Sequence, residues 1–140
     1  MSYSVGQVAK KLEISTHTLR YYDKMGLLPF VERDDSGNRV FKEKDFLMLN
    51  TVDCLKKTGM ELKEIKQYID WCNQGMETVE DRYKLFLDKR KTVLAEINEL
   101  EEMLETIDYK CNFYKNAIES NTLEVCQTER AMFLEKLAKE

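Results

Sequence analysis

An uninterrupted heptad pattern over residues 79–118 sets the strongest limit on the fold of this chain. Its positions alternate four and three residues apart, and all but Arg90 are apolar or weakly polar. A helix of this length is about 60 Å long at ~1.5 Å per residue, too long for its stripe to be buried on one small domain. The pattern therefore predicts a coiled coil, most economically with the same helix of a second chain. The seam consists of Val79, Tyr83, Phe86, Arg90, Val93, Ile97, Leu100, Leu104, Ile107, Cys111, Tyr114 and Ile118.

Residues 1–42 show the layout of a helix-turn-helix followed by a wing. Ser4 forms a capping box with Gln7, and Ser15 is the N-cap of a second helix. Gly26 closes that second helix as the residue after its C-cap. The turn sequence DSGN at 35–38 then separates two strands, expected at 30–33 and 39–42.

The second helix and the wing carry side chains suited to double-stranded DNA. Hydroxyl, imidazole, guanidinium and phenol groups donate hydrogen bonds to phosphates or contact base edges in a major groove. Leu19 and Tyr22 are expected to be core residues instead. The candidate DNA-binding residues are Thr16, His17, Thr18, Arg20 and Tyr21 in the helix, and Arg33, Asn38 and Arg39 in the wing.

Two further helices, one from about Glu43 to Gly59 and one over residues 61–75, complete the N-terminal domain of residues 1–75, which we call the head. Their apolar positions recur at helical spacing and are expected to form the core. The remaining residues suggest a polar turn at 120–122 and a short amphipathic helix. The expected domains are a winged-helix domain at 1–75, a coiled coil at 76–118 and a short effector or packing segment at 119–140. The expected core includes Phe46, Leu49, Val52, Leu55, Leu62, Ile65 and Ile69.

Charge and composition narrow the class of protein. The formal net charge is −4, but residues 1–75 hold 12 Lys and Arg against 11 Asp and Glu, whereas residues 76–140 hold 10 against 15. The acidic excess therefore lies outside the expected DNA surface. Because the chain has no signal-peptide pattern and no apolar run of membrane-spanning length, we expect a soluble, cytoplasmic protein with no membrane partner.

The segment RYYDKMGLL, the downstream Arg33 and the segment GNRVF together resemble the N-terminal module of MerR-type transcription regulators. The resemblance implies a winged-helix homodimer held by an antiparallel coil and bound to promoter DNA with an overlong spacer. It also implies that the activated dimer distorts this DNA so that RNA polymerase engages both promoter elements. In such a coil, two interpretations of Arg90 stay open: it pairs with a carboxylate such as Glu99 or Glu105, or it snorkels at the edge.

Cys54 is the candidate sensor residue. Lys56 and Lys57 follow it closely, and nearby cations favour the reactive thiolate. From the residues alone, packing filler remains the simpler interpretation of this cysteine. The run CLKKTGMELKEIKQYID, however, resembles the branch of the MerR family that responds to reactive aldehydes and related electrophiles through one cysteine in this helix. That resemblance implies that Cys54 is the thiol that is modified.

Three other functions are compatible with parts of the sequence to different degrees. A soft-metal regulator would use Cys72, Cys111 and Cys126, but the last two are 15 residues apart and His17 is the only histidine, so we expect no metal site. A coiled-coil module for protein interaction also stays open. An enzyme is disfavoured because the sequence shows no catalytic triad, paired-carboxylate site or glycine-rich phosphate loop. No cofactor is expected.

Overall fold

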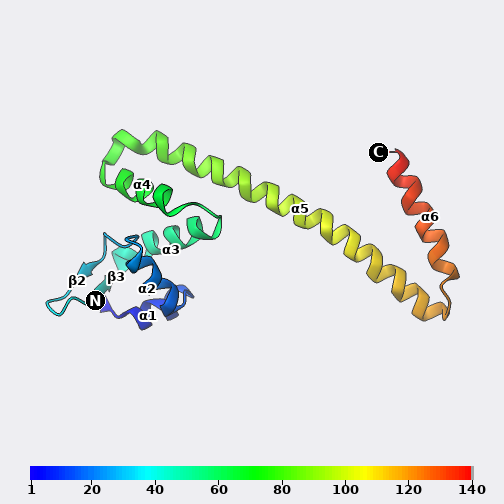
Figure 1. Cartoon of the computed structure of the whole chain (residues 1–140), viewed down its shortest axis with the longest axis horizontal. Coiled ribbons are helices and arrows are strands. Elements are labelled where there is room, and N and C mark those ends of the chain that lie inside the picture. Colours follow the sequence, from blue (N-terminus) through cyan, green and yellow to red (C-terminus); the bar gives the residue numbers. More distant parts are fainter. Residues whose placement is uncertain (140) are drawn as a thin grey trace. The chain divides into compact units, whose positions relative to one another are not determined.

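The computed structural model describes residues 1–139, apart from the side chains of Val125, Cys126, Thr128 and Glu129. The chain divides into two compact units, Met1–Thr92 and Val93–Glu140. The first unit holds four α-helices, three short strands, a 3-10 helix and the start of a long helix (Figure 1). Its buried side chains form one hydrophobic core. The expected mainly helical fold with a small wing is confirmed.

Helices α1 (Val5–Leu12) and α2 (Thr16–Lys24) begin where the capping signals placed them. The Ser4 hydroxyl accepts from the Gln7 amide at 3.3 Å, and the Gln7 side chain accepts from the Ser4 amide at 2.9 Å. Ser15 caps α2 by accepting from the Thr18 amide at 3.0 Å. Gly26 follows the C-cap with φ of 77°, a left-handed conformation that costs glycine little.

The wing belongs to a three-stranded antiparallel sheet with the order β1-β3-β2. Strands β2 (Glu32–Arg33) and β3 (Arg39–Lys42) pair so that Arg33 lies opposite Arg39. Strand β2 is shorter than expected because Val31 is buried in a turn after Pro29 rather than extended. Strand β1 (Ser2–Tyr3), which the sequence did not reveal, pairs with the other edge of β3.

Helices α3 (Glu43–Lys57) and α4 (Leu62–Asn73) complete the core of the first unit. The expected burial of Leu49, Val52, Leu55, Ile65 and Ile69 is confirmed, while Phe46 and Leu62 are partly buried against them. Leu19 and Tyr22 are also core residues, as expected. The full core comprises Val8, Ala9, Ile14, Leu19, Tyr22, Leu27, Leu28, Val31, Phe41, Leu49, Val52, Leu55, Met60, Ile65 and Ile69.

A short 3-10 helix, η1 (Gly75–Thr78), leads into the 42-residue helix α5 (Val79–Ser120), so the predicted long helix is confirmed. Most of its apolar seam is exposed in the single chain. Its exposed seam residues are Val79, Tyr83, Phe86, Ile97, Leu100, Leu104, Ile107, Tyr114 and Ile118. Within the described residues, no helix combines the length and apolar character that crossing a membrane requires.

The second unit joins the end of α5 to helix α6 (Glu124–Lys139) through aromatic rings. The rings of Tyr109 on α5 and Phe133 on α6 lie 4.9 Å apart, and Phe113 is buried beside them, its ring 6.2 Å from that of Tyr109. The turn between the helices contains Asn121 at φ of 53°, within the polar segment that the sequence marked as a turn. Leu134 and Leu137 of α6 remain exposed.

Two leucines of α3 provide a matched test of this packing. Leu49 is buried and Leu47 is 77% exposed on the same helix. We expect Leu49→Ala to lower the free energy of unfolding by about 2–5 kcal/mol, because it leaves a cavity in the core. Leu47→Ala should change it by no more than about 0.5 kcal/mol. Urea unfolding monitored by circular dichroism measures both, and equal losses would contradict the assignment of Leu49 to the core.

Candidate nucleic-acid interface

The outward face of α2 is set by the two side chains that the core buries. Because Leu19 and Tyr22 point inward, His17, Arg20 and Tyr21 are exposed. Thr16 and Thr18 are half-buried near the start of the helix. The Thr18 hydroxyl accepts a hydrogen bond from the Ser15 hydroxyl at 2.7 Å, so it is already part of the N-terminal cap.

The tip of the wing is organised by Asp34. Its carboxylate accepts from the amides of Ser36 at 3.0 Å and Asn38 at 2.9 Å, and its own amide donates to the Asn38 carbonyl at 2.9 Å. Gly37 has a φ of 84°. Asn38 is exposed on this turn. Sequence reasoning missed the role of Asp34, although an Asp that begins a turn is a known signal for such bonds.

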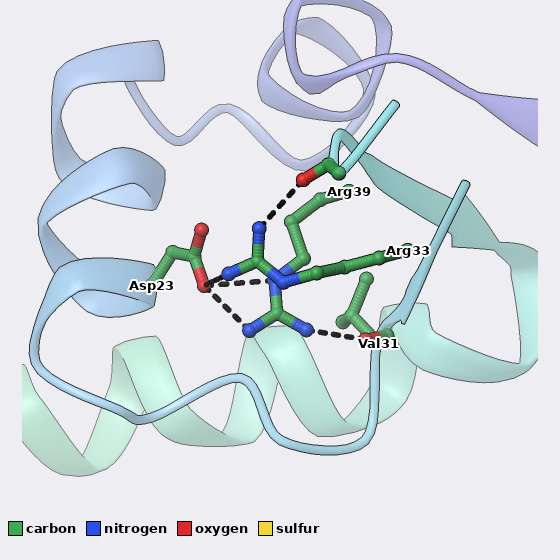
Figure 2. Close-up of polar contacts among 5 residues, drawn as sticks. Asp23, Val31, Arg33 and Arg39 are labelled. Carbon is green, nitrogen blue, oxygen red and sulfur yellow. Dashed lines mark hydrogen bonds and ion pairs between the residues drawn. The ribbon is translucent and has the colours of Figure 1, made fainter. Parts of the chain in front are cut away.

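One carboxylate on α2 joins both arginines of the wing (Figure 2). Asp23 Oδ1 accepts from Arg39 Nε at 2.8 Å and lies 2.7 Å from Arg39 Nη2, while Arg33 Nη2 is 3.4 Å away. Arg39 also donates to the Val31 carbonyl, and Arg33 donates to the Gly37 carbonyl at 2.7 Å. The side chain of Arg39 is 15% exposed and that of Arg33 is 50% exposed. The two arginines expected to reach phosphates therefore have unequal access to solvent.

A groove of about 630 Å³ runs between the start of the chain, α2 and the wing. It brings together four of the candidate DNA-binding residues, Arg20, Arg33, Asn38 and Arg39. Thr16, His17, Thr18 and Tyr21 do not line this groove and lie along α2 instead. Three guanidinium groups in one groove, with the carboxylates of Asp23 and Asp34, make a surface suited to phosphate contacts.

A second carboxylate pairs with two lysines at the base of the wing. Glu32 accepts from Lys42 at 2.5 Å and from Lys44 at 3.3 Å. These hydrogen bonds, the one from Lys42 above all, hold the pKa of Glu32 below its usual value. Lys42 and Lys44 share this one carboxylate, as the two arginines of the wing share Asp23, so each of these two sites keeps a net positive charge.

Cys54 lies exposed in the last turn of α3, next to the buried carboxylate of Asp53. The Asp53 carboxylate accepts from the Tyr22 hydroxyl at 2.8 Å and from Lys57 Nζ at 2.8 Å. Burial first, and then the hydrogen bond to Asp53, raise the pKa of Tyr22. The hydrogen bond to Asp53 also raises the pKa of Lys57. The residue before Cys54 thus connects α3 directly to α2.

The other cysteines have different surroundings. Cys72 is half-buried on α4, where burial and a hydrogen bond with Cys72 raise the pKa of Tyr68 to about 12. Cys111 is exposed on α5, and the Cys126 side chain lies outside the described set. In the part of the chain that the structure describes, no three His, Cys, Asp or Glu side chains are grouped so that they could hold a metal ion.

The family model of MerR HTH family regulatory proteins matches residues 3–71. An uncharacterized HTH-type transcriptional regulator of Haemophilus influenzae is 45% identical over 117 residues, 84% of this chain and 87% of that protein. The crystal structure of HiNmlR, a MerR family regulator lacking the sensor domain, bound to promoter DNA, matches with a TM-score of 0.82 and 42% identity over 90% of this chain and 96% of that chain. The crystal structure of a MerR family transcriptional regulator from Bacillus thuringiensis matches with a TM-score of 0.72 and 41% identity, over 80% of this chain and 98% of that chain.

The groove predicts a change in the salt dependence of DNA binding. We expect Arg20→Gln and Arg33→Gln each to reduce the slope of log K against log salt by about 0.9, the loss of one neutralised phosphate. Arg130, exposed on α6, is the matched control, and Arg130→Gln should leave the slope unchanged. Fluorescence anisotropy with a duplex that the protein enriches from a random-sequence pool measures the slopes. Unchanged slopes for both head variants would contradict the proposed interface.

Proposed function

The chain belongs to the MerR family of helix-turn-helix transcription regulators, and from that premise we propose that it is a homodimeric promoter activator switched by its Cys54 thiol. The signal in this proposal is a reactive aldehyde, a related electrophile or an oxidant. The observation that carries it is the exposed Cys54 beside Asp53, whose carboxylate bonds to Tyr22 of α2. The relatives that match this chain are transcription regulators, and the chain is a DNA-binding regulator rather than an enzyme.

The proposed DNA contacts divide between α2 and the wing. Thr16, His17, Thr18, Arg20 and Tyr21 would contact the duplex from α2, and Arg33, Asn38 and Arg39 belong to the wing surface. The groove supports the assignment of Arg20, Arg33, Asn38 and Arg39. The likeness to HiNmlR, which was crystallised bound to promoter DNA, supports DNA as the partner. We place the chain in the cytoplasm, where its DNA partner would be.

The exposed seam of α5 supports an antiparallel homodimer. Burying apolar surface contributes about 25 cal/mol per Å², so a seam left in water is unfavourable by itself and favourable in a paired coil. A second copy supplies an identical seam without a further component. Pairing would also place two heads on one DNA molecule and double the phosphate contacts, which suits a head with nearly balanced charge.

Two heads held at a fixed separation can distort the DNA between them. In the proposed mechanism, the activated dimer bends and untwists an overlong promoter spacer so that RNA polymerase engages both elements. The deformation is sustained by phosphate contacts on both sides of the distorted centre. A change in the angle between the heads would therefore change transcription without releasing the protein from DNA.

The chemistry at Cys54 needs no further reactant. The thiolate sulfur attacks the carbonyl carbon of an aldehyde, and a C–S bond forms while the C=O π bond breaks. The resulting alkoxide takes a proton from water, which leaves as hydroxide, to give a hemithioacetal. The exposed thiol, with an exposed Leu47 two turns earlier on α3, leaves room for a small electrophile. The adduct adds bulk beside Asp53, and Asp53 holds Tyr22 in the core of the head. Modification on α3 would thereby be transmitted to α2.

We expect Cys54→Ser to abolish activation by methylglyoxal, because an alcohol is a far weaker nucleophile than a thiolate. The variant should still bind the enriched duplex with unchanged affinity. Cys111→Ser, which removes another exposed thiol, is the matched control and should respond like the wild type. A reporter assay measures activation, and mass spectrometry locates the adduct. Activation that survives in Cys54→Ser would overturn the proposed sensor.

We expect Leu100→Asp to dissociate the dimer, because it places a charge in the apolar seam. Asn98→Asp introduces the same carboxylate on the same helix but outside the seam, so it should leave the dimer intact. Analytical ultracentrifugation over a range of protein concentrations measures the dissociation constants. If Leu100→Asp and Asn98→Asp had the same constant, the seam would not be the dimer interface.

A further inference from the structure

We propose that Asp23 is a positioning residue for DNA binding. It holds the wing against α2 through Arg39, and its weaker contact with Arg33 breaks when Arg33 binds a DNA phosphate. This inference rests on the proposed DNA interface but goes beyond it, because Asp23 carries the wrong charge for a phosphate contact. It also gives the two wing arginines different roles, one structural and one directed at DNA.

The contacts of Asp23 are unequal. Two nitrogens of the Arg39 guanidinium lie 2.8 Å and 2.7 Å from Asp23 Oδ1, whereas the single Arg33 nitrogen lies 3.4 Å from the same oxygen. Charge-assisted hydrogen bonds at the shorter distances are strong, and a distance of 3.4 Å is at the weak end of the range. Asp23 therefore holds Arg39 firmly and Arg33 only weakly, and the stronger hydrogen bond of Arg33 is to the Gly37 carbonyl within the wing, at 2.7 Å.

Burial separates the two arginines in the same way. Arg39 is largely buried and its other end donates to the Val31 carbonyl, so moving it would leave two acceptors without their donor. Arg33 is half exposed and lines the open groove. When a phosphate replaces Asp23 as its partner, Arg33 exchanges one anion for another at small cost.

Strand pairing with β1 and side-chain burial fix the wing at its base, but its tip is exposed. Residues 32–38 are all exposed, and its buried side chains, Val31 and Phe41, lie at its base. The Asp23–Arg39 pair joins residues 16 positions apart on two different elements. A polar tie of this kind determines where the tip of the wing and Arg33 lie relative to α2.

The charge of Asp23 allows its two possible roles to be distinguished. As a simple surface carboxylate it would repel DNA, and Asp23→Asn would tighten binding to every sequence. As a positioning residue it aids only the correctly docked complex. We therefore expect Asp23→Asn to bind the enriched duplex about tenfold more weakly while its binding to a scrambled duplex is not weakened. Asp35→Asn, which removes an exposed carboxylate of the wing turn, is the matched control and should weaken neither.

A double-mutant cycle tests which arginine transmits the effect. In an Arg39→Gln background, Asp23→Asn should have no further effect on the enriched duplex, because the tie is already broken. In an Arg33→Gln background, the loss caused by Asp23→Asn should be smaller than in the wild type but not zero, because Arg33 is gone while the rest of the wing tip is still displaced. A full additional loss in the Arg39→Gln background would overturn the proposal, as would tighter binding of both duplexes by Asp23→Asn.

A measurement without DNA separates this inference from the proposed interface. In isotope-edited NMR spectra of the free protein, the Arg39 Nε–H proton should be protected from exchange with water, and Asp23→Asn should remove that protection. The Nε–H proton of the exposed Arg130 provides the unprotected reference. If the Nε–H proton of Arg39 exchanged as fast as that of Arg130, the Asp23–Arg39 hydrogen bond would not exist in solution. Protection of Arg39 together with failure to bind any duplex would instead refute the DNA interface.

Discussion

The burial of Leu19 and Tyr22 fixes the rotation of α2, and the functional surface of the head depends on it. A helix that inserts these two side chains into a core has no freedom to choose its outer face, so Arg20 and Tyr21 must point outward. Tyr22 adds a directional constraint, since its buried hydroxyl donates to Asp53 on α3. Hydrophobic contacts thus set the depth of α2, and one hydrogen bond ties it to the helix that carries Cys54.

In the proposed mechanism, the same hydrogen bond would carry the effect of a reaction on α3 to α2. Breaking it would leave a buried carboxylate with one partner, Lys57, whose side chain is 71% exposed and exchanges easily with water. A packed core responds to such a loss by a small displacement rather than by continuous deformation. A displacement of α2 moves every donor on its outer face together, and the coil would transmit the matching change to a second head.

The sequence revealed those features that depend on local periodicity or on single capping residues. Ser4 and Ser15 located the starts of α1 and α2, and the alternating four-and-three spacing located α5. Contacts between distant polar residues had no such signal. Asp23 with Arg39, and Tyr22 with Asp53, are 16 and 31 positions apart and become neighbours only after the core has packed. Strand β1 has two residues, too few to show any alternation, so its pairing could not be predicted.

The nearly balanced charge of the head is compatible with DNA binding because several of its carboxylates are already paired within the fold. Glu32 is paired with Lys42 and Lys44, Asp53 with Lys57 and Tyr22, and Asp23 with the wing arginines. Asp45, which is buried, accepts from the Lys42 amide at the start of α3. A phosphate approaching the groove therefore meets Arg20 and Arg33 rather than the average charge of the head. Formal charge counts every group equally, whereas the field at an interface depends on which groups already have partners.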